Sequence, residues 1–178
     1  ASGETQRVVA NLPQLTSQGV EVETAFSPTE NLSMNFAATY QDADFGEEAF
    51  PASLSYLEDR GNFNAPKWTL VSSANYDRDL PGTSLRSFAY LDARWQSKSN
   101  VSFSASVGPT HEQEAYATFN GRVGLGSQSE SWTLEVWGRN LTDENAWAMT
   151  GAGTLQPGTV QGYGIEPRTY GAPLRVTL

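Results

Sequence analysis

The chain of 178 residues contains no cysteine and only one histidine, His111. Without thiols it cannot form a disulfide scaffold or a thiolate metal site. A single imidazole also excludes a metal site built from several histidines of this chain. His111 stands beside Glu112 in a polar stretch, where we expect it to be solvated rather than functional.

Basic residues are scarce as well, with 11 Lys and Arg against 20 Asp and Glu, for a formal net charge of −9. A nucleic-acid-binding face needs clustered positive charge, so a nucleic-acid partner is excluded. No nucleophile and base form a pair at a catalytic spacing. We therefore expect no enzymatic activity and no cofactor.

Long hydrophobic runs are also missing. Hydrophobic residues make up 38% of the chain, and no apolar run approaches the ~18 residues of a membrane-spanning helix. No apolar stripe at helical spacing persists either. Apolar residues alternate with polar residues instead, and a side-chain period of two predicts β-strands with two different faces.

The clearest pair of strands lies near the N-terminus. Val20, Val22 and Phe26 alternate with polar neighbours, and residues 27–31 (Ser-Pro-Thr-Glu-Asn) are turn formers. Strict alternation resumes from Leu32 to Tyr40. Two alternating runs around a short turn predict an antiparallel hairpin.

Similar alternation recurs to the end of the chain. The further predicted strands are residues 66–76, 85–95, 115–125, 132–142 and 168–178. Residues 101–107 alternate too and are expected to extend the strand 85–95, although Phe88 and Tyr90 disturb the polar face of that strand. Residues 6–12 are a weaker candidate for an additional strand.

The connections differ in length in a regular way. Short turns at residues 77–84 and 126–131 contrast with the long irregular segments 41–65 and 140–166. Transmembrane β-barrels have short turns at one end and long loops at the other, and their strands need ~9–11 residues to cross a bilayer. The pattern therefore favours antiparallel, up-and-down barrel strands.

The long segment 41–65 begins with an acidic cluster, Asp42, Asp44, Glu47 and Glu48. Carboxylate oxygens are suitable ligands for a hard cation such as Ca²⁺. The spacing does not match an EF-hand loop, however, and acidic loops are usually solvated. We therefore expect no metal site there.

Aromatic residues offer the only candidate ligand-binding positions. Trp137 and Tyr170 stand at strand ends, where an aromatic girdle at the membrane interface is the preferred interpretation. Trp147 and Tyr163 lie inside the long segment 140–166, and we predict that both contribute to ligand binding at the outer mouth of a barrel.

Three motifs resemble the TonB-dependent outer-membrane receptors. Residues 139–144 (Arg-Asn-Leu-Thr-Asp-Glu) are similar to a "kNLtDe" segment of that family. Residues 167–171 (Pro-Arg-Thr-Tyr-Gly) resemble the start of its C-terminal strand, and residues 18–23 (Gln-Gly-Val-Glu-Val-Glu) resemble a strand further upstream. The motifs occur in the family's order and cover the chain from residue 17 onward.

The resemblance implies that residues 1–178 are the C-terminal segment, about seven strands, of a larger barrel of about 22 strands. Such receptors take up iron chelates, cobalamin or glycans across the outer membrane of Gram-negative bacteria, driven by TonB. The resemblance also implies partners: outer-membrane lipid, the TonB complex, and the plug domain with the remaining barrel strands, on the same or a separate chain. No plug sequence is present here.

Two features depart from the family pattern. The last residue is Leu178, where the family usually has Phe or Trp, and Pro173 interrupts the last strand and removes one ladder donor. Two alternatives remain open at this point. One is a soluble, aromatic-rich β-sandwich that binds carbohydrate, and the other is a small outer-membrane barrel of about eight strands that includes residues 6–12.

Overall fold

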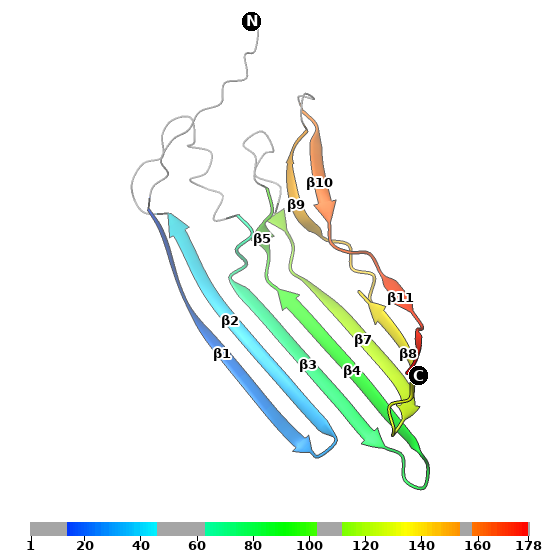
Figure 1. Cartoon of the computed structure of the whole chain (residues 1–178). Coiled ribbons are helices and arrows are strands. Elements are labelled where there is room, and N and C mark those ends of the chain that lie inside the picture. Colours follow the sequence, from blue (N-terminus) through cyan, green and yellow to red (C-terminus); the bar gives the residue numbers. More distant parts are fainter. Residues whose placement is uncertain (1–13, 46–62, 103–111, 154–157, 178) are drawn as a thin grey trace, which may run out of the picture.

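The computed structural model describes residues 14–45, 63–102, 112–153 and 158–177. These residues form β-strands joined by turns and loops, with an eight-stranded antiparallel sheet as the main element (Figure 1). Within these ranges, no helix has the length and apolarity needed to span a membrane.

Six long strands make up most of the sheet. They are β1 (Leu15–Thr29), β2 (Leu32–Phe45), β3 (Trp68–Asp79), β4 (Leu85–Gln96), β7 (Tyr116–Ser127) and β8 (Trp132–Arg139). Each pairs with the previous one in this order, and β8 also pairs with the short strands β11 (Thr169–Gly171) and β12 (Leu174–Val176). This up-and-down order confirms the predicted fold class.

The sheet has two different faces, because successive side chains of a strand point to opposite sides. The cross-strand register aligns the apolar positions of all the strands on one side, which we call the apolar face. It carries Val20, Val22, Phe36, Leu70, Leu91, Phe119, Val123, Leu134, Val136, Leu174 and Val176. Most of these side chains are strongly exposed, as they would be if lipid covered them.

The opposite side, which we call the polar face, carries Glu21, Glu23, Asn35, Thr39, Asn75, Asp92, Asn120, Arg122, Glu135, Arg139 and Arg175. Phe88 and Tyr90 also point to this side, and the structure explains them. The ring of Phe88 occupies the space beside Gly124, its cross-strand partner, where a Cβ would collide with the ring. Tyr90 lies beneath the guanidinium of Arg122.

The two ends of the sheet differ. Three short turns, after β1, β3 and β7, lie at one end, which we call the turn end (Figure 1). The small ladders β5 (Ser99–Asn100) with β6 (Glu112–Gln113), and β9 (Trp147–Ala152) with β10 (Val160–Gly164), lie beyond the other end, the loop end. Short turns opposite long loops is the predicted barrel pattern.

Aromatic rings border the apolar face at both ends. Tyr40, Trp68 and Trp95 lie towards the loop end, and Phe26, Tyr76 and Trp132 lie towards the turn end. The rings of Tyr40 and Trp68 form a tilted pair with centroids 4.9 Å apart. Two aromatic bands separated by an apolar band are typical of transmembrane barrels.

The buried core of the described residues lies at the loop end rather than within the sheet. Val101 and Ala146 are each 2% exposed, and Thr150 is 3% exposed. The backbone N–H of Thr150 donates to the carbonyl of Val101 at 2.7 Å, and that of Asn64 donates to Asn100 at 2.7 Å. Three separate loops are thereby held together above the sheet.

Two predictions about strand boundaries were wrong. The strand 85–95 does not continue into residues 101 and 102, because β4 ends at Gln96 and Val101 packs into the loop core; the rest of the predicted extension, residues 103–107, lies outside the described ranges. The segment 140–166 is not a plain loop, because it contains the β9–β10 hairpin. The candidate strand 6–12 also lies outside the described residues.

Pro173 interrupts the last strand without shifting it. Gly171 pairs with Trp137 and Leu174 pairs with Leu134, so β11 and β12 keep one register and contain no bulge. The N–H of Glu135 donates to the Pro173 carbonyl at 3.1 Å. The returning bond is missing because proline has no N–H.

The described strands do not form the two alternative folds. Among the described residues, no second sheet packs on the apolar face, as a soluble β-sandwich would require. The eight-stranded sheet is open, with β1 at one edge and β11 and β12 at the other, so the described residues form no closed small barrel.

Candidate functional site

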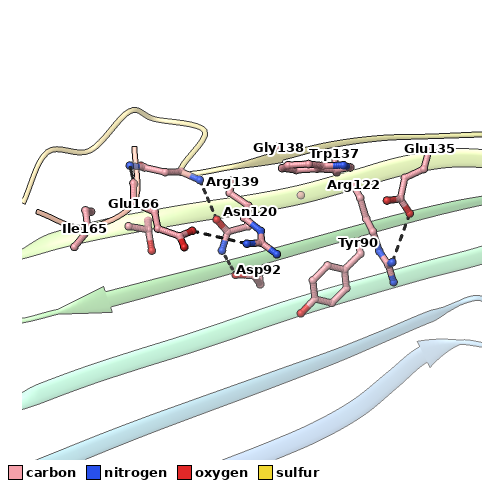
Figure 2. A pocket seen from close by; sticks show the side chains of 13 residues that line it. Tyr90, Asp92, Asn120, Arg122, Glu135, Trp137, Gly138, Arg139, Ile165 and Glu166 are labelled. Atoms are coloured by element: carbon pink, nitrogen blue, oxygen red, sulfur yellow. Dashed lines mark hydrogen bonds and ion pairs between the residues drawn. The ribbon is translucent and has the colours of Figure 1, made fainter. Parts of the chain in front are cut away.

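A hollow of about 690 Å³ lies on the polar face where β4, β7 and β8 meet the segment entering β11 (Figure 2). Its charged and aromatic lining consists of Tyr90, Asp92, Arg122, Glu135, Trp137, Arg139 and Glu166. All but Glu166 come from alternate positions of neighbouring strands, which is why the sequence pattern places them on one face.

Arg122 is held in place from two sides. Its guanidinium carbon lies 5.6 Å from the ring centroid of Tyr90, and Nη1 lies 3.5 Å from Oε2 of Glu135. Arg122 is half exposed, whereas Glu135 is largely buried. Stacking on a ring fixes the orientation of the guanidinium and leaves several of its five N–H donors available to a partner.

Arg139 repeats this arrangement nearer the loop end. Its guanidinium lies 5.8 Å from the ring of Trp137, and its ion pair with Glu166 is long, at 3.8 Å. The Trp137 indole covers Gly171, where a Cβ would lie 2.9 Å from the ring. Trp137 is therefore a packed wall of the hollow and not a girdle residue.

A series of hydrogen bonds links the hollow to residues 140–144, which follow β8 and which we call the corner. Nδ2 of Asn120 donates to Asp92 at 2.7 Å, and Oδ1 of Asn120 accepts the backbone N–H of Asn140 at 2.9 Å. Asn140 has a positive φ of 48°, a conformation that asparagine tolerates better than most residues. The corner is thus anchored to β7.

The side chain of Asn140 joins the two ends of the segment that contains the β9–β10 hairpin. Nδ2 donates to the carbonyls of Glu144 (2.8 Å) and Glu166 (3.0 Å), and Oδ1 accepts the N–H of Glu144 at 2.8 Å. Asn140 is 4% exposed and uses both donors and its acceptor. A shorter or purely apolar side chain could not make these bonds.

The next residue, Leu141, fixes the same corner from the apolar face. Gly121 of β7 and Gly138 of β8 are cross-strand partners, and the Leu141 side chain lies over both. The N–H of Leu141 donates to the Phe119 carbonyl at 2.8 Å. The Asn-Leu pair therefore holds the corner on both faces, which gives the sequence motif at residues 139–144 a structural role.

Asp143 extends the corner towards the last strand. It also has a positive φ (58°), and its carboxylate lies 3.3 Å from the guanidinium of Arg168. Arg168 belongs to the second sequence motif, residues 167–171. The structure thus brings together two motifs that are separated by the whole β9–β10 hairpin.

The hollow can bind but shows no catalytic arrangement among its lining residues. Three carboxylates (Asp92, Glu135 and Glu166) face two guanidiniums, and the hydroxyl of Tyr90 and the amide of Asn120 add further polar groups. Such a lining can receive a partner that carries both charges. The sequence predicts the strand 132–142 with two different faces but does not reveal the hollow, because strand register cannot be read from alternation alone.

The predicted ligand-binding residues Trp147 and Tyr163 both lie on the β9–β10 hairpin and are well exposed. They point to opposite sides of it. A Cβ on Gly162 would lie 2.9 Å from the Trp147 ring, so the ring covers that side, and the adjacent Tyr163 faces the other way. Their role in ligand binding stays a prediction, but they form no joint platform.

The acidic cluster is only partly described. Asp42 forms an ion pair with Lys67 at 2.8 Å, whereas Glu47 and Glu48 lie outside the described residues. In the ranges that the structure covers, no three Asp, Glu, His or Cys side chains are grouped to hold a metal ion.

Comparison with known proteins extends these observations. A family model described as "TonB dependent receptor-like, beta-barrel" matches residues 2–141. No curated protein matches the sequence. The ferric yersiniabactin uptake receptor FyuA of Yersinia pestis has a similar structure, with a TM-score of 0.73 and 17% identity over 93% of this chain. BauA, the ferric preacinetobactin receptor of Acinetobacter baumannii, gives a TM-score of 0.64 and 17% identity over 90%.

The two solved receptors are much longer than the part they share with this chain. The matched region covers 24% of the first and 22% of the second. At this level of identity the likeness concerns the fold, which is that of a barrel wall.

Proposed function

Because the chain belongs to the TonB-dependent receptor β-barrel family, we propose that it is the C-terminal barrel segment of an outer-membrane receptor. The complete receptor would take up a scarce nutrient by TonB-energised transport across the outer membrane of a Gram-negative bacterium. The plug domain and the remaining barrel strands are its proposed partners, on the same chain or a separate one. Outer-membrane lipid would surround the apolar face.

One observation carries this proposal. The register of six long strands gathers most of the large apolar side chains on one face and the charged side chains of the strand centres on the other. The large apolar or aromatic side chains on the polar face include Val71, Phe88, Tyr90 and Trp137. The exposed apolar face is bounded by two aromatic bands, which suits a hydrocarbon layer between two interfaces. The polar face then forms part of the barrel lumen.

The hollow around Arg122 and Arg139, which we call the lumen hollow, is the proposed contact surface for the plug domain. Its mixed charges match a polypeptide surface better than they match a purely anionic ligand. Both guanidiniums are partly exposed and only loosely paired, so a plug carboxylate could bind them without breaking a strong ion pair. In this mechanism the chain supplies a rigid wall, and movement belongs to the plug.

The nutrient is proposed as one of three classes: an iron chelate, cobalamin or a glycan. Both solved relatives are receptors for ferric compounds, so ferric chelates are the first class to test. Ligand capture would use the loop end, where Trp147 and Tyr163 are exposed on the β9–β10 hairpin.

The test combines localisation with binding. We expect the protein to fractionate with outer membranes, to need detergent, and to support uptake of a labelled ferric chelate only when TonB is present. Recovery as a soluble protein without detergent would overturn the proposal. Uptake unaffected by loss of TonB would overturn the energised mechanism.

Variants of the hairpin can locate the ligand. Because Trp147 and Tyr163 lie on opposite sides, Trp147→Ala and Tyr163→Ala should not weaken ligand binding equally. Gln161→Ala, on the same exposed hairpin, is the matched control. Unchanged affinity in both aromatic variants would show that neither ring contacts the ligand.

A further inference from the structure

A second hollow, of about 390 Å³, lies at the loop end between β2, the start of β3 and the β5–β6 ladder. Its lining includes Asp42, Asp44, Lys67, Trp68, Lys98, Ser99 and Glu112. None of these residues belongs to the lumen hollow, and the proposed uptake mechanism uses none of them.

The hollow borders the apolar face, although Gln41 and Ala43, which alternate to the other side of β2, also line it. Asp42 and Asp44 continue the alternation of Tyr40 along β2, so they share its side of the sheet. Trp68 lines the hollow and also pairs with Tyr40 in the aromatic band. The polar lining thus begins where the aromatic band ends, which is the level of lipid headgroups in a membrane.

Both lysines of the 178-residue chain lie in this hollow. Lys67 contacts Asp42 at 2.8 Å and Lys98 contacts Glu112 at 3.1 Å, yet the two lysines are 67% and 61% exposed. The Asp42 carboxylate raises the pKa of Lys67, so this ammonium stays charged. Each ammonium has three donors, and one carboxylate contact leaves the others available.

Ser99 provides an independent sign of an absent partner. It is 6% exposed, it lines the hollow, and its hydroxyl has no hydrogen-bond partner among the residues that the structure describes. Buried polar groups are almost always paired, so an unpaired hydroxyl beside a polar hollow points to a bound molecule that can hydrogen-bond.

We propose that this hollow binds the phosphorylated sugar headgroup of an outer-leaflet lipid. The ammonium groups of Lys67 and Lys98 would bind phosphate, and the carboxylates and Ser99 would bind sugar hydroxyls. A lipid fits better than a soluble sugar phosphate, because its acyl chains can continue along the apolar face below Trp68. The inference rests on the proposed membrane location of the apolar face.

The test measures binding of a diphosphorylated diglucosamine lipid to the detergent-purified protein by native mass spectrometry. The Lys67→Ser/Lys98→Ser variant should bind at least about tenfold more weakly, because charged hydrogen bonds are lost. Arg78→Ser/Arg175→Ser removes the same charge far from the hollow and should bind like the wild type. Equal binding by wild type and the lysine variant would overturn the proposal.

Two further probes separate the sources of phosphate. The dephosphorylated lipid and the soluble diphosphorylated disaccharide should each bind more weakly than the complete lipid. Equal binding of the disaccharide would overturn the lipid assignment in favour of a soluble sugar phosphate, and equal binding of the dephosphorylated lipid would overturn the role of phosphate.

Ser99→Ala distinguishes binding from folding. It should weaken lipid binding without lowering the melting temperature of the lipid-free protein, because the hydroxyl has no protein partner to lose. A lowered melting temperature would contradict the assignment. A protein that fractionates with outer membranes but binds no lipid here would overturn this inference alone, whereas a soluble protein would overturn the proposed function too.

Discussion

Replacing Asn140 by alanine should destabilise the loop end more than any other single truncation of a polar side chain at the corner. The change removes three side-chain hydrogen bonds at 2.8–3.0 Å from a nearly inaccessible site. At about 1 kcal/mol net for each bond, the loss is about 3 kcal/mol. The φ of 48° adds about 1–2 kcal/mol for alanine, which tolerates this conformation less well than asparagine.

Two comparison variants separate these contributions. Asn140→Gly loses the same bonds but accepts the positive φ, so it should be more stable than Asn140→Ala by about 1 kcal/mol. Asn140→Asp keeps an acceptor for the Glu144 N–H but places carboxylate oxygens against two carbonyl oxygens. Its destabilisation should therefore be comparable to that of alanine.

Denaturant unfolding of the protein in detergent measures the total effect, and hydrogen exchange locates it. Faster exchange should be confined to residues 141–166, whose two ends Asn140 joins. An Asn140→Ala protein within about 0.5 kcal/mol of the wild type would refute the assigned role of the side chain. A glycine variant less stable than the alanine variant would refute the role of backbone conformation.

Other positions give independent predictions. Arg86→Ala should lose about 1–3 kcal/mol, measured by denaturant unfolding, because Nε donates to Oδ1 of Asp77 at 2.7 Å and Nη2 donates to Oδ2 of the same carboxylate. Arg86→Lys should recover less than half of this loss, and full recovery would contradict the bidentate geometry. Gly124→Ala should lower the free energy of unfolding by about 1–3 kcal/mol, because the added Cβ would collide with the Phe88 ring. Gly164→Ala is the control, since its Cβ would meet no atom closer than 3.5 Å and should change the unfolding midpoint little. Equal effects of the two variants would contradict the packing argument.

The sheet could be predicted from the sequence because its physical signal is local. A strand with one apolar and one polar face must alternate, and Leu32 to Tyr40 does so without interruption. The strand 85–95 was also predicted correctly, although Phe88 and Tyr90 disturb its polar face, because the apolar residues of its other face still recur at every second position. Alternation does not reveal cross-strand partners, and the lumen hollow depends on them.

The loop end could not be predicted in the same way. Residues 101–107 alternate like a strand, but Val101 lies outside the sheet, buried at the loop end where its carbonyl accepts the N–H of Thr150. The β9–β10 hairpin is rich in glycine and short, so its alternation is weak. An irregularity between Tyr163 and Gly164 then decides which way Trp147 and Tyr163 face.

The motif at residues 139–144 is visible in the sequence, but its structural role is not. Its asparagine and leucine act through residues on β7 and through Glu166, which are far away in the sequence. Those contacts arise only when the sheet and the last strand are assembled. Sequence similarity found the corner, and the hydrogen bonds of Asn140 explain why these residues occur there.

A cysteine scan along β7 tests the central claim, that the sheet is a barrel wall with lipid on its apolar face. The chain has no native cysteine, so single substitutions at Thr118, Phe119, Asn120, Arg122, Val123 and Leu125 can each be labelled alone. In reconstituted bilayers, labels at 119, 123 and 125 should be quenched from the lipid phase. Those at 118, 120 and 122 should react with water-soluble reagents. Loss of this alternation, with both sets open to water, would contradict the account.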